Sequence, residues 1–195
     1  MTVTVVNLAK DAVGMSSNAY LVLGETPVLV DTGANFDAVD AVKSHLDGSL
    51  DRIVLTHTHP DHVDNVEALK AAFDVPVYGY DVDHHLVDSE LDHGETISLG
   101  DHEYESWYTP GHAEDHLCLY SEPASVLFSG DLIFPNGGVG RTDLPGCDHD
   151  DLLESIEYVL ANTDPTLQAL YSGHGPAVDR DAYRHIEAAA NFAGL

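Results

Sequence analysis

The chain has 195 residues, of which 34 are Asp or Glu and only seven are Lys or Arg, so its formal net charge is −27. This length fits one domain with a sizeable core, and we predict that residues 1–195 form a single domain. The hydrophobic fraction of 44% excludes a disordered chain, and the negative charge argues against a nucleic-acid partner because phosphates would be repelled.

Hydrophobic periodicity predicts the strands and helices in chain order. The first part is predicted as strand Thr2–Leu8, strand Ala19–Leu23, strand Val28–Asp31, helix Phe36–Leu46 with Asn35 as its cap, strand Arg52–Thr56 and helix Val63–Phe73. The second part is predicted as strands Pro76–Tyr78, Thr96–Leu99, His102–Tyr108, Leu117–Tyr120 and Ser125–Ser129, helix Asp150–Ala161, strand Gln168–Ser172 and helix Arg180–Phe192. This order favours an α+β fold with two sheets packed face to face and helices outside. A doubly wound parallel sheet fits worse, because too many strands follow one another without a helix.

A histidine-rich segment, HTHPDH, follows the predicted strand that ends near Thr56. In an extended segment, side chains two residues apart point the same way, so His57 and His59 can converge on one metal ion. The turn that follows allows Asp61 and His62 to face a second ion. Three imidazoles and one carboxylate in so short a segment suit zinc or another borderline divalent metal.

Three further candidates come directly after apolar runs, at turns marked by Pro or Gly. They are His112 in TPGH, Asp131 in SGD and His174 in SGHGP. Loops that follow buried strands are where a rigid scaffold displays its ligands. Each residue alone would more often be part of an ordinary turn, but together with the histidine-rich segment they predict a metal centre.

These motifs resemble those of the metallo-β-lactamase superfamily, in which HxHxDH precedes a separate His, Asp and His. The resemblance covers about Asn18 to Pro176 and implies a four-layered αβ/βα sandwich. The ligands that it implies are His57, His59 and His112 for a first metal, Asp61, His62 and His174 for a second, and Asp131 bridging both. Asp31, in VDTG, matches another motif of the family and is expected to orient a ligand, with a plain cap or turn role as the alternative.

The implied ligand set also implies a mechanism. Two cations that share a water lower its pKa towards neutrality and supply hydroxide as the nucleophile, while one cation polarises the substrate carbonyl. Asp61, as a ligand that also holds the hydroxide in line, and Asp131, as the bridge, are therefore the candidate catalytic residues. Neither Cys118 nor Cys147 lies in a nucleophile motif.

Two segments resemble the glyoxalase II-like (hydroxyacylglutathione hydrolase-like) branch and the related persulfide dioxygenases: GRTD at 140–143 and TPGHxxxH ending at His116. Arg141 is expected either to hold a substrate carboxylate or to pair with Asp143, and His116 to pack behind the ligands. This branch implies two Zn²⁺ per chain and a small-molecule thioester, an S-2-hydroxyacyl thiol, as substrate. Full-length glyoxalase II carries a helical C-terminal region that grips glutathione. This chain ends 21 residues after His174, so glutathione is not the thiol we expect.

Other functions fit parts of the pattern. An iron-dependent persulfide dioxygenase would use His57, His112 and Asp131 as a mononuclear site. A nuclease of the tRNase Z type is disfavoured by the lack of a basic arm, and a non-catalytic scaffold by the complete set of seven ligand positions. Lactone and β-lactam hydrolysis remain open, because both use the same hydroxide.

The carboxylates are spread along the whole chain, which contains only three lysines. Self-repulsion on this scale requires screening by salt, so we predict adaptation to a salt-rich cytoplasm, as in halophilic archaea. The N-terminus does not resemble a signal peptide, and no apolar run reaches the length of a membrane helix. We therefore expect a soluble cytoplasmic enzyme with two reduced cysteines and no membrane partner; the sequence does not indicate its oligomeric state.

Overall fold

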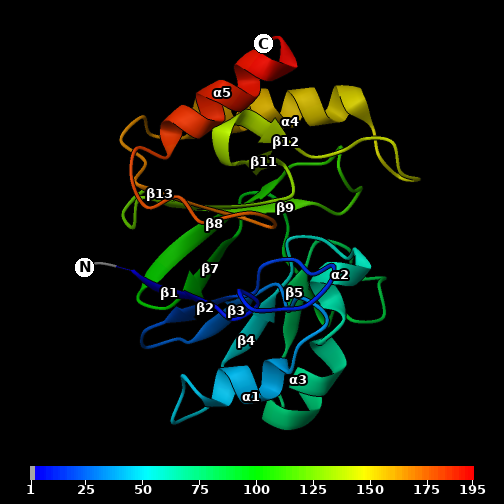
Figure 1. The fold of residues 1–195 in the computed structure, drawn as a ribbon, viewed down its shortest axis with the longest axis vertical. Helices are drawn as coiled ribbons and strands as arrows, with labels where there is room; N and C mark the ends of the chain where they lie inside the picture. Colours follow the sequence, from blue (N-terminus) through cyan, green and yellow to red (C-terminus); the bar gives the residue numbers. More distant parts are fainter. Residues whose placement is uncertain (1–2) are drawn as a thin grey trace.

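The computed structural model describes residues 3–195, and two β-sheets packed face to face form its centre (Figure 1). The first sheet has the strand order β1 (Thr4–Asn7), β2 (Tyr20–Leu23), β3 (Val28–Val30), β4 (Arg52–Val54), β5 (Val77–Gly79) and β6 (Ser89–Glu90). The second has the order β13 (Ala169–Ser172), β10 (Val126–Gly130), β9 (Leu117–Ser121), β8 (His102–Tyr108) and β7 (Thr96–Leu99). A small hairpin pairs β11 (Ile133–Phe134) with β12 (Gly138–Val139), across the short 3-10 helix η1 (Pro135–Gly137).

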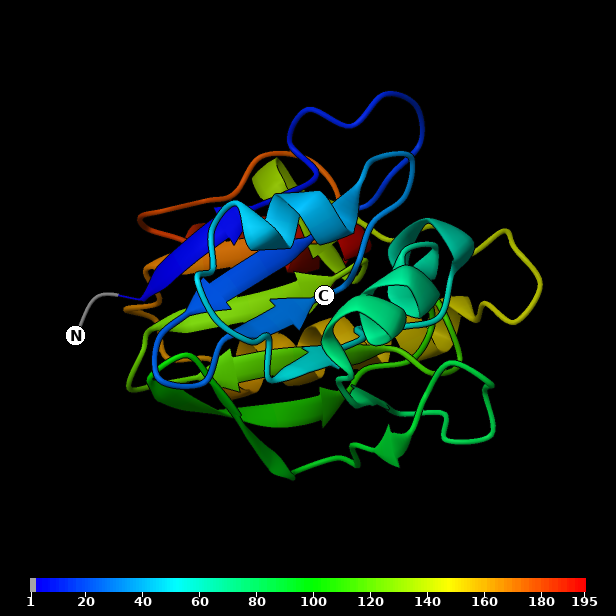
Figure 2. The same cartoon turned by 90° about the horizontal axis from the view of Figure 1, so that it is seen from below.

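Helices cover the outer face of each sheet. Helices α1 (Ala38–Lys43) and α3 (Val66–Phe73) lie on the first sheet, as Figure 2 shows from below, and α2 (Pro60–Val63) follows β4. Helices α4 (His149–Asn162) and α5 (Tyr183–Ala193) lie on the second sheet. No helix in residues 3–195 is long and apolar enough to cross a membrane.

Each sheet packs against the other sheet on one face and against helices on its other face. Successive side chains of a strand point to opposite faces, so they alternate between these two layers of the core. In β2, Tyr20 and Val22 lie in the core between the sheets, whereas Leu21 packs under α1 and α3. In β10, Phe128 lies in the same central core and Leu127 faces α4 and α5. The chain therefore forms an α/β/β/α arrangement, which confirms the predicted four-layered sandwich.

Several predicted elements differ from the observed ones. The cap of α1 was wrongly assigned: Asp37 accepts a hydrogen bond from the Asp40 backbone N–H, while Asn35 lies outside the helix with φ +60°. The predicted helix Val63–Phe73 is broken, because Asn65 turns away to donate to the carbonyls of Thr32 and Gly33. The predicted strand Thr2–Leu8 begins at a residue outside the described range, and only Thr4–Asn7 is extended in a sheet. The predicted helix Arg180–Phe192 begins later, at Tyr183, since Asp181 has φ +51°. The short strands β6, β11 and β12 were missed.

Strand direction brings the predicted ligand loops to one edge. In the second sheet β8, β10 and β13 run in the same direction, because β9 is antiparallel to both β8 and β10 and β13 is parallel to β10. Their carboxyl ends therefore lie together, and each continues into one of the Pro or Gly turns identified above. The loop after β4 meets them from the first sheet.

Candidate metal centre

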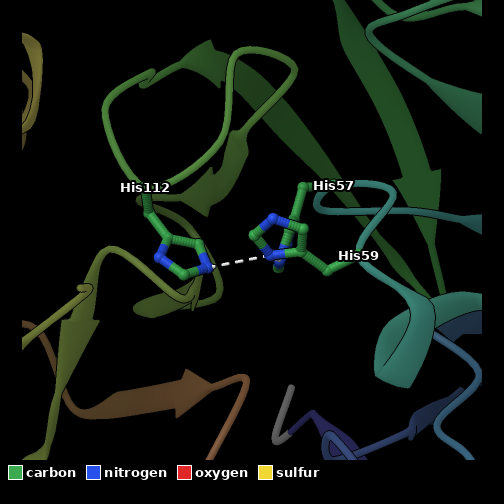
Figure 3. A group of neighbouring side chains, drawn as sticks. All are labelled: His57, His59 and His112. Atoms are coloured by element: carbon green, nitrogen blue, oxygen red, sulfur yellow. Dashed lines mark hydrogen bonds between the residues drawn. The ribbon is translucent and has the colours of Figure 1, made fainter. Parts of the chain in front are cut away.

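Three histidines from two sheets converge on one point (Figure 3). His57 Nε2 lies 3.0 Å from His59 Nδ1, and His112 Nε2 lies 3.1 Å from the same atom. Each ring nitrogen of a neutral imidazole offers either one proton or one lone pair. His59 Nδ1 can therefore make a full hydrogen bond to only one of the two nitrogens beside it. Three nitrogens facing one another suit a shared cation, and His57, His59 and His112 would hold it.

A second set of donors adjoins the first. Asp61, His62 and His174 form one group, and His57, His62 and Asp131 form another that overlaps it. The Asp131 carboxylate lies between them: its Oδ2 is 3.4 Å from both His112 Nε2 and His174 Nε2. All seven predicted ligands thus lie around two adjoining positions, and Asp131 is the one that faces both.

The donors fit divalent cations on physical grounds. His62 Nε2 and Asp131 Oδ1 are buried and make no hydrogen bond to the described residues, although they are only 3.4 Å apart. Burying polar atoms without partners costs free energy, about 1–3 kcal/mol for each unsatisfied group. A cation between them would satisfy both, and imidazole and carboxylate donors are those that zinc and iron accept.

Three of the histidines are oriented by a hydrogen bond at Nδ1, the ring nitrogen that faces away from the converging donors. The Nδ1 atom of His62 is 2.9 Å from Asp31 Oδ2, that of His57 is 3.1 Å from Thr56 Oγ1, and that of His112 is 3.0 Å from the Arg141 carbonyl. Such bonds set the tautomer, so that Nε2 presents its lone pair to a metal. The structure places Asp31 under the site, where it also accepts from the Thr56 backbone N–H at 2.8 Å.

The backbone around Asp131 is closely packed. The fully buried His116 ring accepts a hydrogen bond from the Asp131 backbone N–H at Nε2, 3.0 Å away, so it lies behind the site and not among the ligands. Burial lowers the pKa of His116 to about 3, which keeps the ring neutral and Nε2 free to accept. On the other side, a Cβ added to Gly173 would lie 2.0 Å from Asp131 Oδ1, so only glycine fits there.

Charges at the two positions differ in the metal-free protein. Burial lowers the pKa of His57 far below its usual value. Burial opposes protonation of His62 as well, but the charges of Asp31 and Asp131 outweigh it and raise the pKa to about 10. Hydrogen bonding to Asp131 and Asp61 raises the pKa of His174 to about 9. A cation entering the second position at neutral pH must therefore displace protons.

A cavity of about 450 Å³ opens onto the ligands. Besides ligand side chains it is lined by apolar residues and one cation: Met15, Phe134, Val139, Leu144 and Arg141. The Arg141 guanidinium donates to both oxygens of Asp143, at 2.6 and 2.7 Å, and the pair is exposed. Arg141 therefore forms the predicted ion pair and also stands at the rim of the cavity.

Thr56 and the apolar lining of the cavity are not marked as parts of the site by any sequence pattern. Thr56 precedes the first histidine of the motif, and only its hydroxyl could have drawn attention to it. Met15 and Leu144 lie in loops that no periodicity places beside the ligands.

Known proteins of similar sequence indicate the family to which the chain belongs. The family model described as the metallo-beta-lactamase superfamily matches residues 12–174. The "Probable metallo-hydrolase YqgX" of Bacillus subtilis is 28% identical over 187 residues, which cover 85% of this chain and 88% of the relative. The "Hydroxyacylglutathione hydrolase GloC" of Haemophilus influenzae is 28% identical over 169 residues, 75% of this chain and 79% of the relative.

Among solved structures, the crystal structure of TTHA1623 in a di-iron-bound form is 33% identical to this chain. It superimposes with a TM-score of 0.73 and the match covers 86% of this chain and 92% of that one. The matched family model spans every residue of the ligand groups described above. The chain therefore belongs to the metallo-β-lactamase superfamily and is a metallo-hydrolase of that superfamily.

Proposed function

We propose that the chain is a dinuclear metal hydrolase that cleaves a small thioester, an S-2-hydroxyacyl thiol. The observation that carries the proposal is the convergence of seven side chains on two adjoining positions with Asp131 facing both. A cavity large enough for a small substrate opens directly onto them. The likeness to the Haemophilus hydroxyacylglutathione hydrolase supports the thioester class, and the metal we propose is zinc, with iron as the alternative that the di-iron relative supports.

When bound, divalent cations lower the pKa of water and polarise a carbonyl. The protein's own residues supply position and charge. Asp131 is buried, and although burial raises the pKa of its carboxyl, the neighbouring His174 and His62 rings lower that pKa by more, so the side chain holds a negative charge between the two positions. Asp61 is partly exposed at the mouth, where its carboxylate can orient an attacking water against the substrate. Arg141 at the rim would attract a substrate carboxylate if it exchanged Asp143 for that ligand.

The test is a panel of thioesters with different acyl groups and thiols, assayed beside a persulfide under oxygen. We expect hydrolysis of S-2-hydroxyacyl thiols, and Asp131→Ala should lower the rate by more than the roughly 10–100-fold that loss of an indirect ligand partner costs. Asp47→Ala, which removes an exposed carboxylate that follows α1 and does not line the cavity, is the control and should keep the wild-type rate. Oxidation of the persulfide without thioester cleavage would replace the proposal by the mononuclear dioxygenase.

The cellular setting is part of the same proposal. We infer a cytoplasmic enzyme of a salt-rich cell, supported by the net charge of −27 and its even distribution along the chain. A single domain over residues 1–195, with a small-molecule substrate and no nucleic-acid partner, completes this proposal.

A further inference from the structure

One side chain far from the ligand motifs holds the loop that carries His174. The Asn18 amide nitrogen donates to the carbonyls of Ser172, at 2.8 Å, and Gly175, at 3.0 Å. The Asn18 backbone N–H donates to the carbonyl of Gly173 at 2.7 Å. Three of the four carbonyls in Ser172–Gly175 are thus bound by one residue more than 150 positions earlier in the chain.

The orientation of the Asn18 amide is itself fixed. Its Oδ1 accepts from Asn7 Nδ2 at 2.8 Å, so its nitrogen must face the His174 loop. Tyr20 reinforces the link, because its hydroxyl lies 2.8 Å from Asn18 Nδ2 and donates to the Ser172 carbonyl at 3.0 Å. Asn18 therefore acts in a defined geometry that an acceptor-only side chain could not reproduce.

The neighbouring residue, Ser17, contacts the segment that carries Asp61, another partly exposed ligand candidate. The backbone N–H of the buried Ser17 donates to the Asp61 carbonyl at 3.1 Å. Asp61 and His174 face each other across 3.3 Å and belong to the same group of donors. The segment Ser17–Asn18 therefore links the start of α2, which carries Asp61, to the loop after β13, which carries His174.

We propose that Asn18 is a positioning residue for the second metal: it holds His174 against Asp61 across the two sheets and sets the affinity of that position alone. The inference rests on the two-metal centre of the proposed function. The first group, His57, His59 and His112, has no hydrogen bond to Asn18 in the described residues. Loss of the amide should therefore act on one position and leave the other unchanged.

The test is a calorimetric titration of the metal-free protein with Zn²⁺, comparing the wild type with Asn18→Asp and Asn18→Ala. Asn18→Asp keeps the shape but replaces two donors by an acceptor that faces carbonyl oxygens, and Asn18→Ala removes the donors without adding charge. Asn162→Asp is the matched control, since Asn162 also donates to a carbonyl, that of Tyr158, but on the exposed face of α4. We expect an unchanged first binding step and a second step weakened by about 10–100-fold in both Asn18 variants.

Two further readouts separate positioning from a purely structural role. The melting midpoint of metal-free Asn18→Ala should stay close to that of the wild type, and excess Zn²⁺ should restore its second site by mass action. Equal weakening of both steps together with a lower melting midpoint would overturn the proposal, and so would two unchanged steps. A wild-type chain that binds two metals but cleaves no thioester would overturn the proposed function and leave this inference intact.

Discussion

Asp131 faces both candidate metal positions, and its surroundings leave little freedom. Its backbone N–H is held by His116, and its Oδ1 lies against the backbone of Gly173. A carboxylate fixed in this way cannot move aside for a larger neighbour, because interiors of proteins are packed almost without voids. The position of the Asp131 carboxylate therefore depends on Gly173, a residue that offers no ligand atom of its own.

Gly173→Ala is expected to disrupt the centre, since the new Cβ would lie 2.0 Å from Asp131 Oδ1 and 2.7 Å from His62 Cε1. Overpacking of this kind costs about 1–3 kcal/mol, and here it displaces two ligands as well. Metal content per chain should fall to one or less, measured by elemental analysis, with a lower melting midpoint. Gly48→Ala, which has open space and an ordinary φ, is the control. Full metal content in Gly173→Ala would contradict the close packing described here.

At the scale of elements, α4 is joined to the first metal position through its N-terminus. The Asp148 side chain accepts from the backbone N–H groups of Asp150 and Asp151, and its own N–H donates to the Gly111 carbonyl at 2.8 Å. Gly111 immediately precedes His112. The start of α4 and the turn that displays a ligand are therefore one unit.

Asp148→Ala should lower the free energy of unfolding by about 1 kcal/mol, the usual cost of losing a helix cap. Asp148→Asn keeps an acceptor oxygen and should lose much less. Urea unfolding followed by circular dichroism would measure both. Equal stability of the alanine variant and the wild type would show that the cap contributes nothing.

The sequence predicted some elements better than others, for a physical reason. Strands such as Thr96–Leu99 and His102–Tyr108, both in the second sheet, were predicted to the residue, because their apolar and polar side chains largely alternate with the period of a strand. Thr56 acts through the Asp31 carboxylate and the His57 ring, and Asn18 acts through carbonyls that follow β13 in the other sheet. No local pattern encodes these contacts. The break between α2 and α3 has the same origin, since Asn65 turns towards carbonyls that are distant in sequence.

At the scale of the whole molecule, charge is the dominant feature. Within residues 3–195, Lys and Arg form three ion pairs with carboxylates: Lys70–Asp88, Arg141–Asp143 and Arg180–Asp179. Most of the 34 acidic residues therefore have no cationic partner. Their mutual repulsion opposes a native state whose stability is typically only about 5–15 kcal/mol.

Salt should therefore stabilise the fold. The Debye length is about 30 Å at 0.01 M and about 3 Å at 1 M, so molar salt confines repulsion to immediate neighbours. Melting followed by circular dichroism in about 0.05 M and about 2 M KCl should give a markedly higher midpoint in the concentrated buffer. Identical midpoints would mean that the acidity has another cause, and the inference of a salt-rich cell would fall with it.

The measurement that tests the central claim most directly is the metal content of the purified protein, prepared without added metal and determined by elemental analysis beside a protein assay. Seven ligand side chains around two adjoining positions predict close to two divalent cations per chain, with zinc the commonest. A reproducible content of one iron per chain would contradict the dinuclear hydrolase and favour the mononuclear dioxygenase instead.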